Sequence, residues 1–172
     1  TFQDNKRGPI IITDGALNIK PSLETKKSII TNVINFASKV KNFDAKIAIL
    51  SATEEILDQM ESSSDAYKLM KWSKKSFPNQ KIFGPLAFDN AISKEAASIK
   101  EIFNPVAGNA NIIIVPNIET GNALVKIMVN FMNSIAGGFI VGGKIPVVIT
   151  SRSDNAESRL SSISNAILSI DN

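Results

Sequence analysis

A hydroxyl, a guanidinium and a carboxylate follow one another directly after an apolar stretch that predicts a strand. The members of this corner are Thr150, Ser151, Arg152, Ser153 and Asp154. An arginine donates two parallel hydrogen bonds to phosphate or carboxylate oxygens, and a helix start adds free N–H groups and the positive end of the helix dipole. The pattern therefore predicts an anion-binding corner. The alternative is structural, with Ser153 capping the helix and Arg152 pairing with Glu157 on the surface.

Polar residues also gather where another predicted strand turns into a helix, at residues 116–122. The candidate ligand-binding residues there are Asn117, Thr120, Gly121, Asn122 and, one turn further on, Lys126. Their spacing matches neither a Walker motif nor a dinucleotide-binding fingerprint, so it gives no support for nucleotide hydrolysis. The alternative is plain helix capping, with Thr120 or Asn117 at the helix start and Lys126 in solvent.

A third cluster is the apolar loop at residues 84–91, which holds Asp89 and Asn90. Surface loops rarely contain leucine, alanine and phenylalanine in a row. Either Phe88 packs inward while Asp89 makes a turn, or the loop lines a pocket. Two further carboxylates that could serve as acids or bases are Asp14, at the end of the first predicted strand, and Glu157.

The composition excludes several kinds of chemistry. The 172 residues contain no cysteine and no histidine, which rules out within this chain a Ser-His-Asp triad, a histidine-ligated zinc and a cysteine nucleophile. We expect no metal site, and any general base must be Asp or Glu, or failing these Lys or Tyr. The net charge of +3 is spread among interspersed acids and bases, so we expect no nucleic-acid partner. The longest apolar stretch, at residues 135–149, is broken by glycines and a proline, so no membrane span is expected.

Short β-branched runs alternate with amphipathic stretches, which is typical of an α/β fold with a mostly parallel sheet and helices on both faces. Strands are expected at residues 9–13, 46–50, 81–85, 111–115, 136–141 and 147–149. Helices are expected at residues 22–40, 54–77, 93–100 and 121–132, and from Ser153 or Asp154 to residue 170. Each polar cluster follows the carboxyl end of a strand, where open α/β sheets bind ligands.

Four motifs, taken in order along the chain, resemble the phosphate acetyltransferase and phosphate butyryltransferase family. They lie at residues 13–18, 84–91, 115–122 and 150–154, and the segment 23–27 is more similar to the butyryltransferase branch. The resemblance implies an isocitrate/isopropylmalate-dehydrogenase-like fold with the active site between two domains. It also implies a cytoplasmic homodimer that converts acyl-CoA and phosphate into acyl phosphate and CoA, with no cofactor besides CoA as substrate.

The resemblance further implies that the chain is part of a two-domain enzyme. Family members are about twice this domain-sized length, and the chain begins at Thr1 without an initiator methionine, so we expect a missing N-terminal domain. Residues 1–150 would form the α/β domain. Residues 151–172 would form a C-terminal helix that packs on the missing domain.

Individual roles follow from the same likeness. Arg152 would hold the phosphate, and Ser151 would hydrogen-bond the phosphate or the acyl carbonyl oxygen, beside the substrate-binding candidates already named and Thr150. Gly142 matches a family glycine near the site. One position departs from the pattern, because the acetyltransferase branch has an aspartate six residues after the arginine where this chain has Ser158. The general base therefore stays open between Asp154 and Glu157.

The residues leave two other functions open. The chain could be the transferase part of a fusion with a hydratase-like domain, or a non-catalytic module that kept the CoA or phosphate pocket. The preference for an acetyl, butyryl or other acyl group is likewise not specified.

Overall fold

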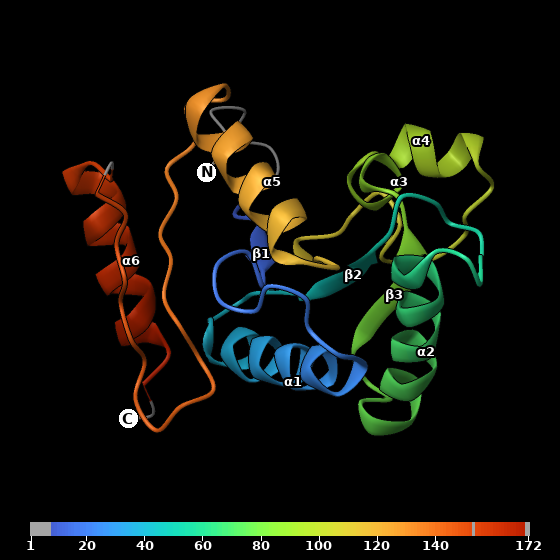
Figure 1. The fold of residues 1–172 in the computed structure, drawn as a ribbon, viewed down its shortest axis with the longest axis horizontal. Coiled ribbons are helices and arrows are strands. Elements are labelled where there is room, and N and C mark those ends of the chain that lie inside the picture. Colours follow the sequence, from blue (N-terminus) through green and yellow to red (C-terminus); the bar gives the residue numbers. More distant parts are fainter. Residues whose placement is uncertain (1–7, 153, 171–172) are drawn as a thin grey trace.

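The sheet has four strands that all run parallel, in the order β1-β4-β2-β3 (Figure 1). The computed structural model describes residues 8–152 and 154–170. The strands are β1 (Ile11–Thr13), β2 (Lys46–Leu50), β3 (Lys81–Leu86) and β4 (Ile112–Ile114). This arrangement confirms the parallel α/β fold expected from the alternating sequence pattern.

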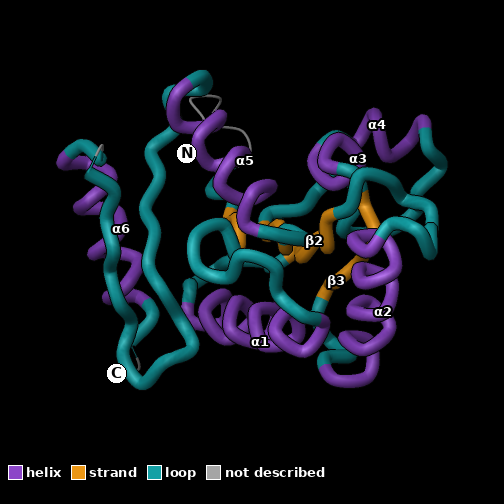
Figure 2. Tube along the Cα trace, viewed as in Figure 1, coloured by secondary structure: helices purple, strands orange, loops and turns teal. Residues whose placement is uncertain are grey.

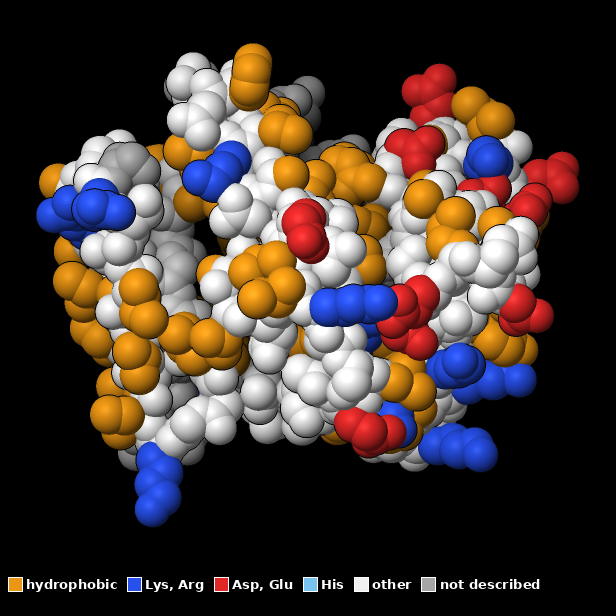
Figure 3. All heavy atoms as spheres, in the orientation of Figure 1, with side chains coloured by type: hydrophobic (Ala, Val, Ile, Leu, Met, Phe, Trp, Pro, Cys, Tyr) orange, Lys and Arg blue, Asp and Glu red, His pale blue; other side chains and the backbone are white. Residues whose placement is uncertain are grey.

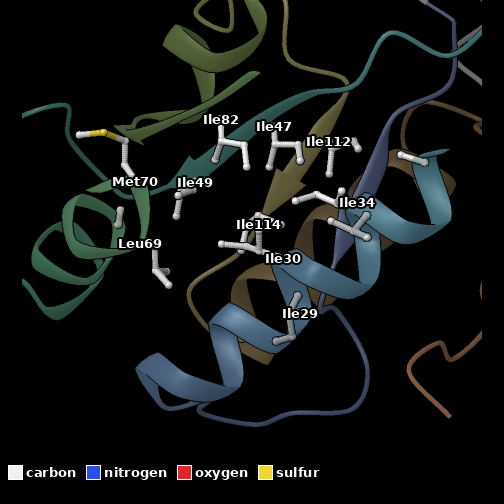
Figure 4. Close-up of a cluster of buried hydrophobic side chains, with 13 residues drawn as sticks. Ile29, Ile30, Ile34, Ile47, Ile49, Leu69, Met70, Ile82, Ile112 and Ile114 are labelled. Atoms are coloured by element: carbon white, nitrogen blue, oxygen red, sulfur yellow. The ribbon is translucent and has the colours of Figure 1, made fainter. Parts of the chain in front are cut away.

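Successive residues of the two central strands point to opposite faces of the sheet. Ile47 and Ile49 of β2 and Ile112 and Ile114 of β4 face one hydrophobic cluster, while Ala48 and Ile113 face the other. The first cluster packs against α1 (Leu23–Lys39) and α2 (Glu61–Ser76), as Figure 4 shows for Ile30 and Leu69. Each isoleucine that is removed from water in this way stabilises the fold by about 1.5–3 kcal/mol.

The second face is covered by short elements. These are α3 (Phe88–Ile92), α4 (Lys94–Ile99) and the segment before β4, with Leu124 of α5 (Ile118–Asn130) packed against the same cluster. Helices therefore cover both faces, as the sequence predicted. No helix in the described part of the chain is long and apolar enough to cross a membrane.

Several element boundaries differ from the prediction because side-chain hydrogen bonds set them. The second helix begins at Glu61 rather than residue 54, because the Ser63 hydroxyl holds residues 55–57 in a turn by bonding Glu55 O and Leu57 N. Residues 88–91, expected as part of a loop, lie in α3 (Phe88–Ile92). α5 begins at Ile118 rather than at residue 121, because the Asn117 side chain caps it. The last helix, α6 (Ala156–Leu168), is capped by Asn155, so the prediction of Asp154 as the cap is wrong, and Ser153 lies outside the described residues.

The two strands predicted at residues 136–141 and 147–149 are not formed. Residues 133–152, which we call the arm, are drawn as loop along their described length in Figure 2. A single antiparallel bridge between Ile140 and Val147 joins the two halves of the arm. The arm lies beyond β1 and away from the sheet, so its β-branched residues lack a neighbouring strand with which to pair (Figure 1).

The tip of the arm packs on α1, and α6 packs on the arm. Phe139 stacks edge-to-face on Phe36 with ring centroids 5.1 Å apart. On α6 the Ser162 hydroxyl accepts a hydrogen bond from Gly138 N at 3.0 Å, and Lys39 Nζ donates to Ser169 O at 2.7 Å. α6 therefore touches the domain mainly through the arm. The division of the chain at residue 150 stays a prediction.

Candidate functional site

A cavity of about 500 Å³ opens at the carboxyl edge of the sheet, where β2 and β4 end. The loop after β1, the first turns of α1, α2 and α5, and the residues that follow β2 and β4 form its wall. Its polar side chains include Asn117 and Thr120, which the sequence singled out, and four that it did not, namely Lys20, Lys26, Ser51 and Ser62. Convergent polar groups in a concave site of this size are typical of small-molecule binding.

Asn117 and Thr120 also build the start of α5. Asn117 Oδ1 accepts hydrogen bonds from Thr120 N at 3.0 Å and from Thr120 Oγ1 at 2.7 Å. The capping alternative is thus what the geometry shows, although both residues remain part of the cavity wall. Gly121 is buried against the loop after β1, where an added Cβ would lie 2.6 Å from Gly15 Cα. Its lack of a side chain lets α5 approach the sheet edge closely.

The other two candidates of this cluster lie elsewhere. Asn122 and Lys126 are exposed on α5 and are not among the residues that line the cavity. They are one helical turn apart, which places them on one face of α5. The role of Asn122 and Lys126 in substrate binding stays a prediction. Neither residue lies where it could contact a ligand in this cavity.

Asp14 organises the loop that carries Lys20 to the cavity. Its carboxylate accepts hydrogen bonds from the backbone N–H groups of Ala16, Leu17 and Asn18 and from the Asn18 side-chain amide. Partial burial raises the pKa of this carboxyl, but the four hydrogen bonds together lower it further, so that the pKa lies below the ordinary value of 3.8. A carboxylate with all these bonds is a weak base, so we assign Asp14 a structural role.

The lowered pKa of Asp14 makes its contribution to stability dependent on pH. A depressed folded-state pKa adds stability above the unfolded pKa near 3.8, and that stability is lost as the pH falls through the folded value. We expect Asp14→Asn to cost about 1 kcal/mol at pH 7, as the loss of a helix cap does. In urea unfolding, the difference in free energy of unfolding between the variant and wild type should become smaller below about pH 4. A gap that stays constant with pH would contradict this role, and Asp58→Asn on an exposed turn is the control.

The cluster at residues 84–91 forms a separate polar network beside α3 and α4. Asn90 is buried, and its Nδ2 donates to Glu54 Oε2 at 3.2 Å, while Lys100 Nζ donates to Glu54 Oε1 at 2.6 Å. The Lys100 hydrogen bond is the largest cause that lowers the pKa of Glu54. Asp89 is exposed, and its Oδ1 accepts from Asn90 N. Neither Asp89 nor Asn90 lines the cavity, so this cluster ties the loop after β2 to α3.

The predicted anion-binding corner forms a turn at the end of the arm, just before α6. Asp154 Oδ2 accepts a hydrogen bond from Ser151 N at 2.7 Å, and Asp154 N donates to Ser151 O at 3.1 Å. Thr150 and Arg152 are exposed. Because neither a strand before the corner nor a helix directly after it is formed, the expected strand-to-helix geometry is wrong. Asp154 instead places a carboxylate in the same turn as Ser151 and Arg152.

The structure does not bring this corner to the cavity. The corner lies beside the start of α6, at one side of the molecule, whereas the cavity lies by the first turns of α1, α2 and α5 (Figure 1). Gly142 sits at the other end of the arm, where a Cβ would collide with the Asn32 side chain of α1. Glu157 is exposed in the first turn of α6, while Ser158 is buried. The predicted site residues therefore fall into separate groups.

Sequence signals could have found only some of the missed cavity residues. Ser51 directly follows β2, so the rule that ligands bind at the carboxyl ends of strands points to it. Lys26 lies in the segment 23–27 that resembles the butyryltransferase branch, but nothing in the sequence showed that its side chain would be buried. Ser62 lies in the first turn of α2, a helix whose start was predicted seven residues too early. In the described part of the chain no group of three or more acidic side chains could hold a metal ion.

Comparisons with known proteins agree along the length of the chain. The family model described as phosphate acetyl/butaryl transferase matches residues 2–167. The chain is 41% identical over 160 residues to a phosphate acetyltransferase of Rhizobium meliloti, covering 92% of the chain and 51% of that protein. It is 42% identical over 159 residues to a probable phosphate butyryltransferase of Bacillus subtilis, covering 92% of the chain and 53% of that protein.

A solved structure shows the same fold. A branched-chain phosphotransacylase from Enterococcus faecalis superposes with a TM-score of 0.81 at 40% identity, covering 92% of the chain and 57% of that structure. The chain therefore spans about half the length of the relatives it matches.

Proposed function

Because the chain belongs to the phosphate acetyltransferase and butyryltransferase family, we propose that the full-length protein transfers an acyl group between CoA and inorganic phosphate. The observation that carries this proposal is the family match over residues 2–167. The reaction converts acyl-CoA and phosphate into acyl phosphate and free CoA. Similar relatives include both acetyl and butyryl transferases, so either acyl group is a candidate.

The proposed chemistry is a direct transfer in a ternary complex. In the direction of acyl-CoA synthesis, the CoA thiolate attacks the carbonyl carbon of the acyl phosphate. A C–S bond forms, the bond from the carbonyl carbon to the phosphate oxygen breaks, and phosphate leaves with the electron pair. The thiol, whose ordinary pKa is about 8.5, must first give its proton to a base. We propose no cofactor beyond the substrates.

The residues of the corner suit the charge that develops in this reaction. We assign Arg152 to the phosphate oxygens, which match its planar fork, and Ser151 to the phosphate or the carbonyl oxygen. Of the two open candidates for the base, Asp154 is the better placed, because its Oδ2 accepts from Ser151 N in the same turn. Glu157 is the exposed acid in the first turn of α6.

A further domain of the full-length protein would complete the site by packing on α6. This helix presents small residues such as Ser162 and Ala166 to the arm, whereas larger apolar residues on the helix and just after its end are exposed: Leu160, Ile163, Ile167 and Ile170. These four recur at intervals of three and four residues, which places them on one stripe of the helix. Hydrophobic side chains gather over α6 and the neighbouring arm in Figure 3. An apolar stripe turned outward supports a partner on that side.

We propose that the full-length protein is a homodimer. From the resemblance we expect the dimer contact to lie in the domain described above. Phe131 is 85% exposed at the end of α5, near the half-exposed Ile127 and Met132, and gives a second apolar surface of the kind that such contacts use. The cytoplasmic location expected from the sequence stays a prediction.

The experiment is a thiol-release assay with the purified full-length protein. With phosphate and either acetyl-CoA or butyryl-CoA, we expect free CoA thiol to appear together with an equal amount of acyl phosphate. Omitting phosphate is the control and should stop the release. A protein that releases no thiol from either acyl-CoA contradicts the proposal, and so does release that needs no phosphate.

The non-catalytic alternative has one observation in its favour. At the position where the acetyltransferase branch has an aspartate, this chain has Ser158, which is buried. A full-length protein that binds CoA in calorimetry without turnover would support a binding module instead. The same assay separates it from the transferase.

A further inference from the structure

Lys26 is the one cavity residue whose charge is almost wholly enclosed. It is 4% exposed, and it reaches from the first turn of α1 to α2, where its Nζ lies 2.8 Å from Asp65 Oδ2. An ammonium group has three N–H donors. Among residues 8–152 and 154–170, Asp65 is the only hydrogen-bond partner found for them. Since leaving a buried charge incompletely hydrogen-bonded is costly, the remaining donors favour an acceptor in the cavity.

The position of Lys26 between two cavities supports this. Lys26 lines both the 500 Å³ cavity and a small cavity of about 10 Å³ beside it, and Asp65 lines only the small one. The carboxylate that neutralises Lys26 therefore sits on the side away from the larger cavity. A ligand in the larger cavity would contact Lys26 without contacting Asp65.

The neighbouring groups also suit an anion. The Ser51 and Ser62 hydroxyls share a hydrogen bond of 3.2 Å in the wall, in which either can donate, so the hydroxyl that accepts keeps its own proton for a ligand. α2, a helix of 16 residues, begins at the wall, and its N-cap residue Met60 makes no side-chain capping bond. The first N–H groups of α2 and its positive dipole end are thus not satisfied by a cap. The remaining acid, Glu61, is paired with Lys20 at 2.7 Å.

We propose that this cavity binds a phosphate group and that Lys26 is the cation that holds it. The inference rests on the proposed function, which supplies two sources of phosphate: inorganic phosphate with its acyl derivative, and the phosphates of CoA. Both present the same oxygens to the ammonium and hydroxyl groups. At about 500 Å³ the cavity is larger than a phosphate ion, so it can hold groups attached to it.

The test compares binding by variants of the full-length protein in calorimetry. Lys26→Met alone would leave the charge of Asp65 buried without its partner. The variant is therefore Lys26→Met with Asp65→Leu, which replaces the buried pair by apolar residues of similar size. The matched control is Lys27→Met, since the neighbouring Lys27 pairs with the exposed Glu24. The ligands are inorganic phosphate, CoA, and pantetheine, which lacks every phosphate of CoA.

We expect the double variant to bind a phosphate ligand about 10- to 100-fold more weakly, the range that a lost hydrogen bond to a charged group gives. Pantetheine binding and the control variant should be unchanged. A loss for inorganic phosphate would assign the reacting phosphate to the cavity in place of the corner around Arg152, and a loss for CoA alone would assign the cavity to the phosphates of CoA. Unchanged affinity for both ligands, or wild-type protein that binds neither, overturns the proposal.

A second measurement needs no variant. In amide NMR spectra of wild-type protein, phosphate or CoA should shift the Ser62 and Asn117 signals more than that of Asn122, which is outside the cavity. Shifts confined to the corner around Arg152 would overturn the cavity assignment. If turnover is found while the Lys26 variant binds normally, the pocket inference fails and the transferase stands. If binding depends on Lys26 and no turnover is found, the cavity inference stands and the proposed transferase function fails.

Discussion

Arg152→Ala in the full-length protein is expected to lower kcat by about a hundredfold or more and to leave the fold unchanged. The side chain is exposed on the turn before α6, so its removal opens no cavity in the core. What it removes is the bidentate donor that we assign to the phosphate oxygens, whose charge grows as the bond to the acyl carbon breaks. Steady-state kinetics with phosphate and acyl-CoA, beside a thermal melt, measures both effects.

Arg159→Ala is the matched control, because Arg159 is also exposed and lies in the second turn of α6. It should keep turnover within about twofold, as an exposed charge outside the site contributes little. Arg152→Lys separates charge from geometry, since lysine keeps the positive charge without the planar fork. Full activity in Arg152→Ala with an intact fold would place the phosphate elsewhere and remove the corner from the mechanism.

The parallel sheet could be predicted because its signal is local. Strands such as residues 46–50 and 111–115 are short β-branched runs, and α1 carries an apolar stripe at helical spacing. The local pattern of each element therefore predicts which of its residues are buried. The arm could not be predicted in the same way. Its β-branched residues have strand propensity, but a strand needs a neighbour with which to pair, and within the described chain Val147 finds only one bridge to Ile140.

The candidate site divides along a similar line. Asn117 and Thr120 were found because they follow a strand, and the sheet edge does bring them to the cavity. Lys26 was not predicted as a cavity residue, because its burial depends on Asp65, a residue 39 positions away in the sequence. The corner at residues 150–154 was found as a motif, while its geometry depends on what packs against α6. Pairings between distant segments, which sequence patterns leave open, decide these cases.

Gly121→Ala is expected to destabilise the protein by about 1–3 kcal/mol, although alanine is the better helix former by about 1 kcal/mol. The added Cβ would lie 2.6 Å from Gly15 Cα and 2.9 Å from Val115 Cγ2, both closer than real methyl groups approach. The first neighbour is backbone, so it cannot move aside as a flexible side chain would. α5 must therefore shift away from the end of β1, and urea unfolding will show the loss.

Two controls isolate this close contact from the effect of an alanine as such. Asn122→Ala, at the next position on the exposed side of α5, should keep or raise stability, because it changes only helix propensity. Gly138→Ala, in the arm, has no atom within 4 Å of the new Cβ and should change stability by less than about 0.5 kcal/mol. If Gly121→Ala proved as stable as wild type, the loop after β1 would have to move to make room for the added methyl group at little cost in free energy. In that case Asp14, which holds this loop by four hydrogen bonds, would not be fixing the wall that carries Lys20.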